Sequence, residues 1–374
     1  MKRTIESEFI VVGGGVIGAS IAWGLTRLGR KVLVADEGDI AVRPSRGNFS
    51  LIWVQSKGLG MVPYGFWAKR AAELWPAFAG ELEAASGIEL GFIQPGGVHL
   101  VLSEQELAVR ANTFVRLRQQ AGVDIYPHEM LDRATVKKML PDIGPEVAGA
   151  SYCPLDGQVN PLRLLMALHT AMIRGGTTYL PEQKVADITY VGEEFQLQTL
   201  DFLLVSKKLV LAAGHDNVRL APMVGLQAPV RPQRGQIMIT EKVRPFLAYP
   251  TINVRQTDEG GVQIGDSMEE VGFDQGLDLG VLSTIAQRTS RMFPLLRRLN
   301  VVRAWGALRV MPKDGYPIYD QSRQCPEAFL ATAHSGVSMS PSHALDLARM
   351  IDQGALGPEI SSLSARRFDV PAAA

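Results

Sequence analysis

The chain has 374 residues, which is more than one hydrophobic core usually supports, so two domains are expected. Hydrophobic residues make up 46% of it and charged residues 20%, the composition of an ordinary globular protein. The 38 basic and 38 acidic residues cancel, and a chain without net charge has no general attraction for nucleic acid or an anionic membrane surface.

The cysteines and the N-terminal segment bear on metal binding and on the cellular compartment of the chain. Cys153 and Cys325 lie far apart and outside any C-x-x-C spacing, so the chain cannot build a zinc site or an iron–sulfur cluster from its own cysteines, and no metal is expected. The first residues lack the apolar run of a signal peptide, and no later stretch has about 18 uninterrupted apolar residues. We therefore expect a soluble, cytoplasmic protein without a membrane span.

Residues 9–36 are typical of a β-α-β unit. The apolar run 9–12 leads into Gly13-Gly14-Gly15-Val16-Ile17-Gly18, and apolar residues then recur at helical spacing until Gly29. Residues 31–35 form a second apolar run, which ends at Asp36. Strand, tight turn, helix and strand follow in the order that the unit requires.

Further elements alternate between helices and strands. We expect a helix over 66–82, a hairpin with strands at 92–93 and 98–102, and a helix to residue 120 that begins with a capping box of Ser103 and Glu106. Asn160 and Pro161 begin a helix over 162–173. The later predicted elements are strands over 185–199, 209–211, 236–239, 262–264 and 329–332, and helices over 281–292 and immediately after His334-Ser335-Gly336. Residues beyond 361 are expected to be loosely held.

The glycines of the first turn match the spacing G-x-G-x-x-G. Gly13 permits the turn, Gly15 lets a pyrophosphate approach the backbone, and Gly18 lets the helix pack on the strand. The helix N-terminus then offers amide donors and a partial positive charge to the pyrophosphate. Asp36 stands where a carboxylate accepts hydrogen bonds from a ribose, and its charge disfavours NADP. The alternative is that the glycines only close a turn; the pattern itself does not say which dinucleotide is bound.

A resemblance to a known family covers nearly the whole chain. The segments that carry it are the glycine turn, Arg46-Gly47-Asn48-Phe49-Ser50, Gly157-Gln158-Val159-Asn160-Pro161, Ala212-Ala213-Gly214, Arg234-Gly235-Gln236, Trp305-Gly306-Ala307-Leu308-Arg309 with Asp314-Gly315-Tyr316-Pro317, and His334-Ser335-Gly336-Val337. In this order they resemble the D-amino-acid oxidase-like (DAO) family of FAD-dependent amine oxidoreductases, which includes glycine oxidase and sarcosine oxidase. Residues 45–50, 53–58 and 333–337 are most similar to the β subunits of opine oxidases and D-hydroxyproline dehydrogenases, with the flavin subunit of hydrogen cyanide synthase as a neighbour.

The resemblance and the element order together predict the fold and the partners. We expect an α/β (α+β) protein in which a Rossmann-type FAD-binding domain (residues 1–60, 145–215 and 320–374) is interleaved with a substrate-binding domain (61–144 and 216–319) on a mixed, largely antiparallel sheet. The resembled β subunits work beside an α subunit that carries further redox cofactors, so such a partner is implied.

The resemblance also implies the residues that contact FAD. It puts Arg46, Gly47, Asn48 and Ser50 near the flavin and its ribityl chain, although Arg46 could also be an ordinary solvated loop residue. The full set of predicted cofactor residues is Gly13, Gly15, Val16, Ile17, Gly18, Asp36, Glu37, Arg46, Gly47, Asn48, Ser50, Leu51, Val185, Ala213, Gly214, Arg309, His334, Ser335, Gly336, Val337 and Ser338. Cys325 lies well beyond the place where some relatives attach the flavin covalently, so non-covalent FAD is expected.

Arg309 and His334 are the predicted catalytic residues. Arg309 lies in an apolar segment and could hold a carboxylate with two parallel hydrogen bonds, as the matching arginine of the family does; the alternative is a structural salt bridge. His334 precedes the last predicted helix, whose positive end could face the N1–C2=O edge of the flavin. A hydrogen-bonded core histidine is the alternative for His334.

The sequence therefore favours FAD-dependent oxidation of the Cα–N bond of an amino acid or secondary amine, such as an opine or D-hydroxyproline, by hydride transfer to the flavin. Two alternatives stay open at this point. One is a nicotinamide-dependent dehydrogenase, which would also carry the glycine turn and Asp36. The other is a non-catalytic FAD-binding assembly subunit. Neither the exact substrate nor the electron acceptor follows from the sequence.

Overall fold

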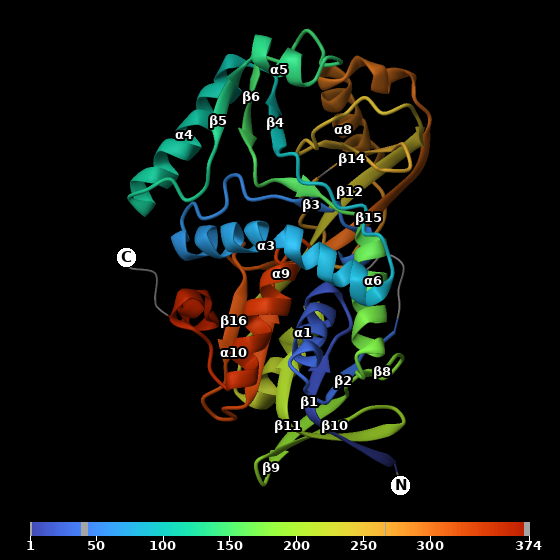
Figure 1. The fold of residues 1–374 in the computed structure, drawn as a ribbon, viewed down its shortest axis with the longest axis vertical. Coiled ribbons are helices and arrows are strands. Elements are labelled where there is room, and N and C mark those ends of the chain that lie inside the picture. The colour runs from blue at the N-terminus through green and yellow to red at the C-terminus, as the bar shows by residue number, and fades with distance from the viewer. Residues whose placement is uncertain (1, 39–43, 266, 370–374) are drawn as a thin grey trace.

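The computed structural model describes residues 2–38, 44–265 and 267–369. In Figure 1 the described chain forms two parts that lie one above the other along the longest axis of the molecule. The lower part is built on a large sheet, and the upper part on smaller sheets with helices around them.

The largest sheet among the described residues has eight strands. Its parallel strands are β1 (Arg3–Val12), β2 (Val32–Ala35), β8 (Thr178–Leu180), β11 (Phe202–Leu211) and β17 (Ala328–Thr332). Its antiparallel strands are β16 (Ile318–Gln321) at one edge, β10 (Glu194–Gln198), which pairs with the first half of β11, and β9 (Asp187–Val191), which pairs with β10. The main order is β16-β17-β11-β1-β2-β8, so the two strands of the predicted β-α-β unit are direct neighbours, as expected.

Both faces of the large sheet are covered, which explains the unbroken apolar runs in its central strands. Phe9 and Val11 of β1 pack into a core that includes side chains of α1 (Val16–Arg27), α3 (Val62–Ser86) and α6 (Pro161–Arg174). Ile10 and Val12 point the other way, into a core shared with β9 and β10. Successive side chains of β1 therefore pack into two different cores, one on each face of the sheet.

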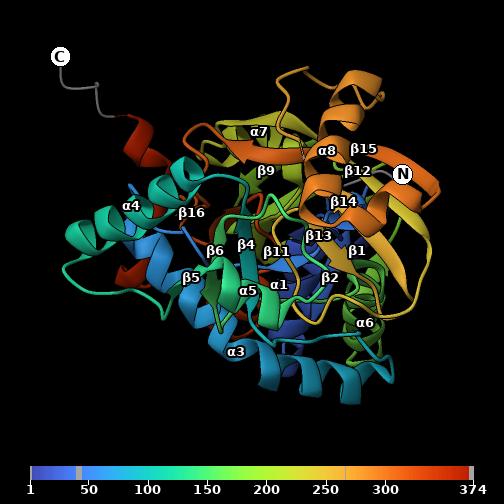
Figure 2. The ribbon, with the colours of Figure 1, turned by 90° about the horizontal axis from the view of Figure 1, so that it is seen from above.

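The upper part contains further sheets. One has the order β13-β14-β12-β15, and another the order β4-β6-β5. Their strands are β4 (Gly97–Val101), β5 (Glu129–Asp132), β6 (Gly149–Cys153), β12 (Val230–Lys242), β13 (Val254–Gln256), β14 (Gly261–Gly265) and β15 (Val301–Pro312). A shared core joins the two sheets; α4 (Glu104–Ala121) packs beside β4 and β6, and α8 (Leu279–Met292) packs beside β12 and β14 (Figures 1 and 2). The mixed α/β fold is confirmed; the exact domain boundaries stay a prediction.

The predicted helix caps are present. Ser103 Oγ accepts a hydrogen bond from Glu106 N at 3.1 Å, which begins α4. Asn160 Oδ1 accepts from the amides of Leu162 and Arg163 at 3.1 and 3.2 Å, which begins α6. These polar side chains satisfy amides that the first helical turn leaves without a partner.

The predicted hairpin at residues 92–102 is wrong. Ile93 forms a bridge with Gln158, while β4 pairs along its whole length with β6, which lies about fifty residues further on. The turn between them is real, since Gly96 has a φ of 98°. A turn signal shows where the chain reverses, but it does not say which strand will be the partner.

The C-terminal segment is held more firmly than expected. Leu363 and Ala365 are buried, and Ser364 Oγ donates to Asp320 Oδ2 at 2.8 Å. The expectation of a loose tail is therefore wrong up to residue 369; residues 370–374 lie outside the described range. Of the helices in the described ranges, none combines the length and the apolar composition needed to cross a membrane.

Candidate active site

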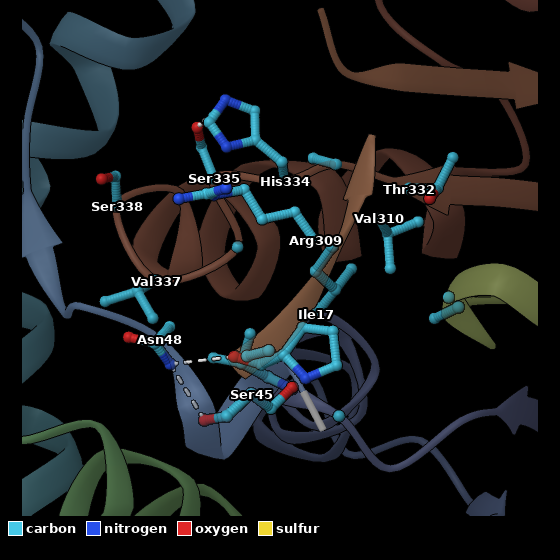
Figure 3. Close-up of a pocket in the computed structure, with 18 of the residues that line it drawn as sticks. Ile17, Ser45, Asn48, Arg309, Val310, Thr332, His334, Ser335, Val337 and Ser338 are labelled. Atoms are coloured by element: carbon cyan, nitrogen blue, oxygen red, sulfur yellow. Dashed lines mark hydrogen bonds between the residues drawn. The ribbon is translucent and has the colours of Figure 1, made fainter. Parts of the chain in front are cut away.

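A cavity of about 610 Å³ lies at the carboxyl ends of β1, β2, β11 and β17. Ligands of open α/β sheets bind at such ends. Every residue predicted to contact the cofactor lines this cavity, except Gly18 and Arg46. Segments far apart in sequence meet here: the glycine turn, residues 44–58, the ends of β11 and β17, and the middle of β15 (Figure 3).

The glycine turn forms one end of the cavity. Gly13 has a φ of 105°, which side chains rarely allow, and its amide donates to Ala35 O at 2.8 Å. Gly15 directly precedes α1, and the amide of Val16 donates to Ser45 Oγ at 3.0 Å. Gly18 serves packing instead: a Cβ there would lie 1.9 Å from Gly13 O. The roles expected for the first and third glycines thus match the backbone geometry.

Asp36 and its neighbours line the cavity beside β2. The Asp36 side chain is buried, and Tyr179 OH donates to its Oδ2 atom at 3.4 Å. The backbone is fixed on both sides, since Asp36 N donates to Leu180 O and Asp36 O accepts from Gln183 N. Glu37 forms an ion pair of 3.2 Å with Lys184. A carboxylate held in this way can accept hydrogen bonds from a ribose.

The loop after β2 supplies polar groups to the middle of the cavity. Asn48 Nδ2 donates to the carbonyl oxygens of Pro44 and Ser45, both at 3.1 Å (Figure 3). Asn48 Oδ1, Ser50 Oγ and Thr332 Oγ1 are buried without a hydrogen-bond partner among the described residues. Such orphaned atoms are costly unless a ligand bonds to them, so their presence in the cavity wall fits a polar cofactor.

Arg46 and Gly47 belong to the short helix α2 (Pro44–Gly47). Arg46 does not line the cavity, whereas Gly47 does. A Cβ at Gly47 would lie 2.7 Å from the Ala307 side chain of β15, and Trp305 Nε1 donates to Gly47 O at 2.9 Å. Gly47 therefore fastens this loop to the sheet that carries Arg309.

Arg309 lies on β15 and its guanidinium lines the cavity wall. Its Nη1 atom donates to Ser267 O at 2.8 Å. A Cβ at Gly235, on the neighbouring strand β12, would lie 2.5 Å from Arg309 Nη2, so the absence of a side chain there makes room for the guanidinium. In Figure 3 the Arg309 side chain extends toward the turn that holds His334 and Ser335.

His334 lies in the turn after β17 and lines the cavity, through which its side chain stays exposed. Its Nε2 atom is 3.2 Å from Ser335 Oγ. Desolvation by the surrounding protein, together with the positive charges of Lys57 and Arg309, lowers the pKa of His334 below its usual value of 6.5. The imidazole is therefore uncharged at neutral pH.

The helix expected directly after Gly336 begins later. Residues 334–339 form turns, and the regular helix begins at Ser340, continues as a π-helix over His343–Leu347, and ends with α10 (Ala348–Gln353). The positive end of a regular helix therefore does not start at His334, which corrects the prediction. Pro341 stands in the first helical turn, where proline is favoured because its missing amide is not needed there.

Sequence reasoning assigned no role to several cavity residues. Lys57 Nζ donates to Ser335 Oγ at 2.7 Å and to Tyr64 OH at 2.9 Å. Tyr316 and Ser45 line the cavity as well. Lys57 lies within a segment that carries the family resemblance, but no local pattern shows that it meets Tyr64 of α3 and Ser335 of the turn after β17.

Comparison with known proteins identifies the family. A family model described as FAD dependent oxidoreductase (DAO) matches residues 8–350. The chain belongs to this family. It is 44% identical to a subunit of opine oxidase from Agrobacterium tumefaciens (97% of this chain, 98% of the relative) and 42% identical to the subunit of the same name from Rhizobium meliloti (97% and 98%). Glycine oxidase of Geobacillus kaustophilus is 26% identical, over 97% of this chain and 98% of the relative.

Solved structures confirm the fold. The crystal structure of glycine oxidase from Geobacillus kaustophilus has a TM-score of 0.86 at 24% identity and covers 96% of this chain and 98% of its own. That of L-proline dehydrogenase from P. horikoshii has a TM-score of 0.85 at 21% identity and covers 99% of each chain. The predicted family and fold class are thus confirmed, and the chain is an FAD-dependent oxidoreductase.

Proposed function

We propose that this chain oxidises the Cα–N bond of an amino acid or secondary amine, an opine or D-hydroxyproline being typical, with FAD held non-covalently. The observation that carries the proposal is that Arg309 and the uncharged His334 line the same cavity as the glycine turn. The two relatives that are opine oxidase subunits support the substrate class. Membership of an FAD-dependent family argues against a nicotinamide cofactor.

The residues of the cavity suit the parts of FAD. The amides at the start of α1 and the turn at Gly13 and Gly15 would hold the pyrophosphate, and Asp36 would hold the ribose. Asn48, Ser50 and Thr332 would bond to the polar edge of the flavin and its ribityl chain, since each has a buried polar atom without a partner among the described residues. When bound, FAD supplies the hydride acceptor.

The chain itself would bind and orient the substrate. Arg309 holds the substrate carboxylate through two charge-assisted hydrogen bonds, and its bond to Ser267 O fixes the direction of the guanidinium. Loss of hydride from Cα requires a neutral amine, and the uncharged His334 places no additional positive charge beside it. The resulting imine is hydrolysed by water to a 2-oxo acid and an amine, unless the product is cyclic.

Non-covalent attachment agrees with the positions of the cysteines. Both Cys153 and Cys325 are buried, and neither lines the cavity. The names of the two opine oxidase relatives describe subunits, so we further propose that this chain works with an α subunit that carries additional redox cofactors and receives the electrons.

The purified chain tests the proposal directly. It should show flavin absorbance, and acid precipitation should release all of the FAD into the supernatant. With an artificial electron acceptor, it should oxidise at least one member of a panel of opines, hydroxyprolines and small amino acids. A chain that binds FAD but turns over no amine, alone or with its α subunit, would instead be a non-catalytic assembly subunit. Rapid hydrogen peroxide formation by the chain alone would contradict electron transfer to a partner.

A further inference from the structure

Residues 268–302 carry an unusual share of the exposed apolar side chains. Among the described residues, 21 large apolar side chains are exposed, and eight of them lie in this short stretch. They are Met268, Val271, Phe273, Leu277, Leu279, Leu295, Val301 and Val302. Leu279 is 79% exposed and Met268 76%, so water covers most of each side chain. Apolar groups gathered at the surface in this way mark a site of contact with another molecule.

The stretch follows the open edge of a sheet. β15 is the last strand in the order β13-β14-β12-β15, so within the described chain only one of its sides pairs with a strand, and it runs along the outside of the upper part in Figure 1. The amide of Asp278 donates to Gln236 Oε1 at 2.9 Å, and a Cβ at Gly306 would lie 3.2 Å from Gly276 O. Because Gln236 and Gly306 are direct partners in the sheet, the loop before α8 crosses β12 and β15 there. We call the surface that carries the eight apolar side chains the β15 edge surface.

The loop of this surface is held in place by Arg234. The Arg234 side chain is buried, and it donates from Nη2 to Glu269 Oε2 at 2.7 Å and from Nη1 to Asp274 Oδ2 at 2.6 Å. Arg234 N also donates to Glu269 O at 2.9 Å, and Glu269 N donates to Arg234 O at 3.0 Å. The exposed apolar side chains therefore stand on a fixed backbone, and contact with a partner requires little further ordering of this loop.

One end of the β15 edge surface is basic. Glu241 N donates to Asn300 O at 2.9 Å, which brings the end of β12 beside the start of β15. The two segments carry the exposed basic residues Lys242, Arg244, Arg297, Arg298 and Arg303. None of the five forms an ion pair within the part of the chain that the structure describes. Charges of one sign gathered in this way are complementary to carboxylates of a partner.

The other end of the β15 edge surface is acidic. Its loop carries more carboxylates than the guanidiniums that pair with them can neutralise. The carboxylates are those of Glu269, Glu270, Asp274 and Asp278, and the guanidiniums are those of Arg231 and Arg234. One surface thus combines an excess of negative charge, exposed apolar side chains and an excess of positive charge.

Such a surface is complementary to itself. In an isologous interface the same residues of two copies meet around a two-fold axis, so the acidic end of one copy can face the basic end of the other. An anionic lipid surface would match only the basic end and would repel the acidic end. The chain has no net charge, so two copies do not repel each other as a whole. We propose that two copies of this chain associate through the β15 edge surface and bury its apolar side chains between them.

The loop of the β15 edge surface also borders the cavity. It begins at Ser267, whose carbonyl oxygen accepts from Arg309 Nη1 at 2.8 Å. The Phe273 ring lies 5.4 Å from the ring of His215, which lines the cavity. Association of two copies therefore covers the segment that positions Arg309. The inference does not depend on the reaction proposed for the cavity, because it concerns a contact outside it.

Sedimentation equilibrium of the full FAD-loaded chain over a range of concentrations tests the association, and we expect dimers. Leu279→Asp places a charge among the apolar side chains. The fold should tolerate it, because Leu279 is exposed and stands first in α8, where an acidic residue is favoured. The dissociation constant should rise by about 30-fold or more, the effect of losing a central side chain of an interface. Val302→Asp should act in the same way. Leu200→Asp changes another exposed leucine, in the turn between β10 and β11, and should leave the dimer unchanged.

Charge reversal tests the arrangement of the two ends. One variant combines Arg297→Glu, Arg298→Glu and Arg303→Glu, which makes both ends of the surface acidic. A second combines Glu270→Lys and Asp274→Lys, which makes both ends basic. Each variant alone should associate more weakly than the unmodified chain, since like charges then meet across the two-fold axis. An equimolar mixture of the two should form dimers again, because each end meets an end of opposite charge.

Each other outcome decides against the inference. A chain that is monomeric at every concentration contradicts it and leaves the surface to a different partner. Dimers that persist in both Leu279→Asp and Val302→Asp use another face of the molecule, and dimers that Leu200→Asp also dissociates do not depend on this surface. A mixture of the two charge-reversed chains that stays monomeric contradicts the match between acidic and basic ends. Circular dichroism accompanies each measurement, so that only folded variants are compared.

Discussion

The Cβ position of Gly18 lies 1.9 Å from the carbonyl oxygen of Gly13, so α1 can approach the turn before it only because residue 18 has no side chain. Gly18→Ala should push the helix away from the end of β1. Forced overpacking of this kind costs about 1–3 kcal/mol. Urea denaturation followed by circular dichroism should show a free energy of unfolding that is lower by this amount.

Gly80 provides a matched control for that substitution. It lies in α3, and a Cβ there would meet nothing within 4 Å. Gly80→Ala should raise the free energy of unfolding by about 0.5–1 kcal/mol, because alanine favours the helix over glycine. If Gly18→Ala and Gly80→Ala had the same free energy of unfolding, the close approach of α1 to the glycine turn would not contribute to stability.

Gly15 should matter for the cofactor and not for the fold. It lines the cavity, and a Cβ there would lie 2.9 Å from Ser45 Oγ, which accepts from the first amide of α1. Gly15→Val would place methyl groups where the pyrophosphate should approach the backbone. We expect a protein with an unchanged circular dichroism spectrum that purifies without flavin absorbance. If Gly15→Val purified with its full content of flavin, the glycine turn would not be part of the cofactor site.

The elements that the sequence predicted correctly are those set by neighbouring residues. The strand, turn and helix around Gly13 and the caps at Ser103 and Asn160 depend on contacts within a few positions of the chain, so spacing alone reveals them. The family resemblance added the distant segments, and the structure brings almost all of their predicted residues to one cavity.

The errors and omissions share a physical cause, which is pairing between distant segments. The partner of β4 is β6 because their side chains enter one core, and no turn residue specifies this. The bond from Lys57 to Ser335 joins positions 278 residues apart, and Ser45 acts by accepting from an amide 29 residues earlier. Such contacts leave no periodic pattern in the sequence.

Asp156 should make stability depend on pH. Its pKa is about 7 in the folded protein, against a usual value of 3.8, because the carboxyl group is buried. The folded state then holds a proton that the unfolded state has lost, so the contribution of Asp156 to stability falls as the pH rises from about 4 to about 7. Asp156→Asn removes this loss and can still accept the bond from Val54 N. The free energy of unfolding of Asp156→Asn, taken relative to that of the unmodified protein, should be higher at pH 8 than at pH 4 by on the order of a few kcal/mol.

The comparison requires unfolding curves of both proteins at several pH values. Asp142→Asn removes a carboxylate from an exposed position, and its effect on the free energy of unfolding should be the same at each pH. A constant difference for Asp156→Asn as well would mean that Asp156 is ionised in the folded protein across this range.

Substitution of Arg309 gives the most specific test of the proposed reaction. Lysine at this position keeps the charge but loses the planar fork, so Arg309→Lys should impair turnover less than Arg309→Ala while remaining clearly defective. Loss of hydrogen bonds to a charged group costs about 1.5–3 kcal/mol, which corresponds to roughly ten- to 200-fold in kcat/KM for the alanine variant. FAD content should not change in either variant.

The control is an amine that lacks the carboxylate. A guanidinium that binds the carboxylate contributes nothing to such a substrate, so its turnover should be almost the same in Arg309→Ala and in the unmodified protein. The bond from Arg309 Nη1 to Ser267 O offers a competing explanation, because the alanine variant loses it too and could loosen β15 and its neighbours. That structural role would lower the activity on both substrates equally, or release FAD, or reduce the free energy of unfolding. Only a loss confined to the carboxylate substrate, in a stable protein that retains its flavin, supports the assignment of Arg309 to the substrate.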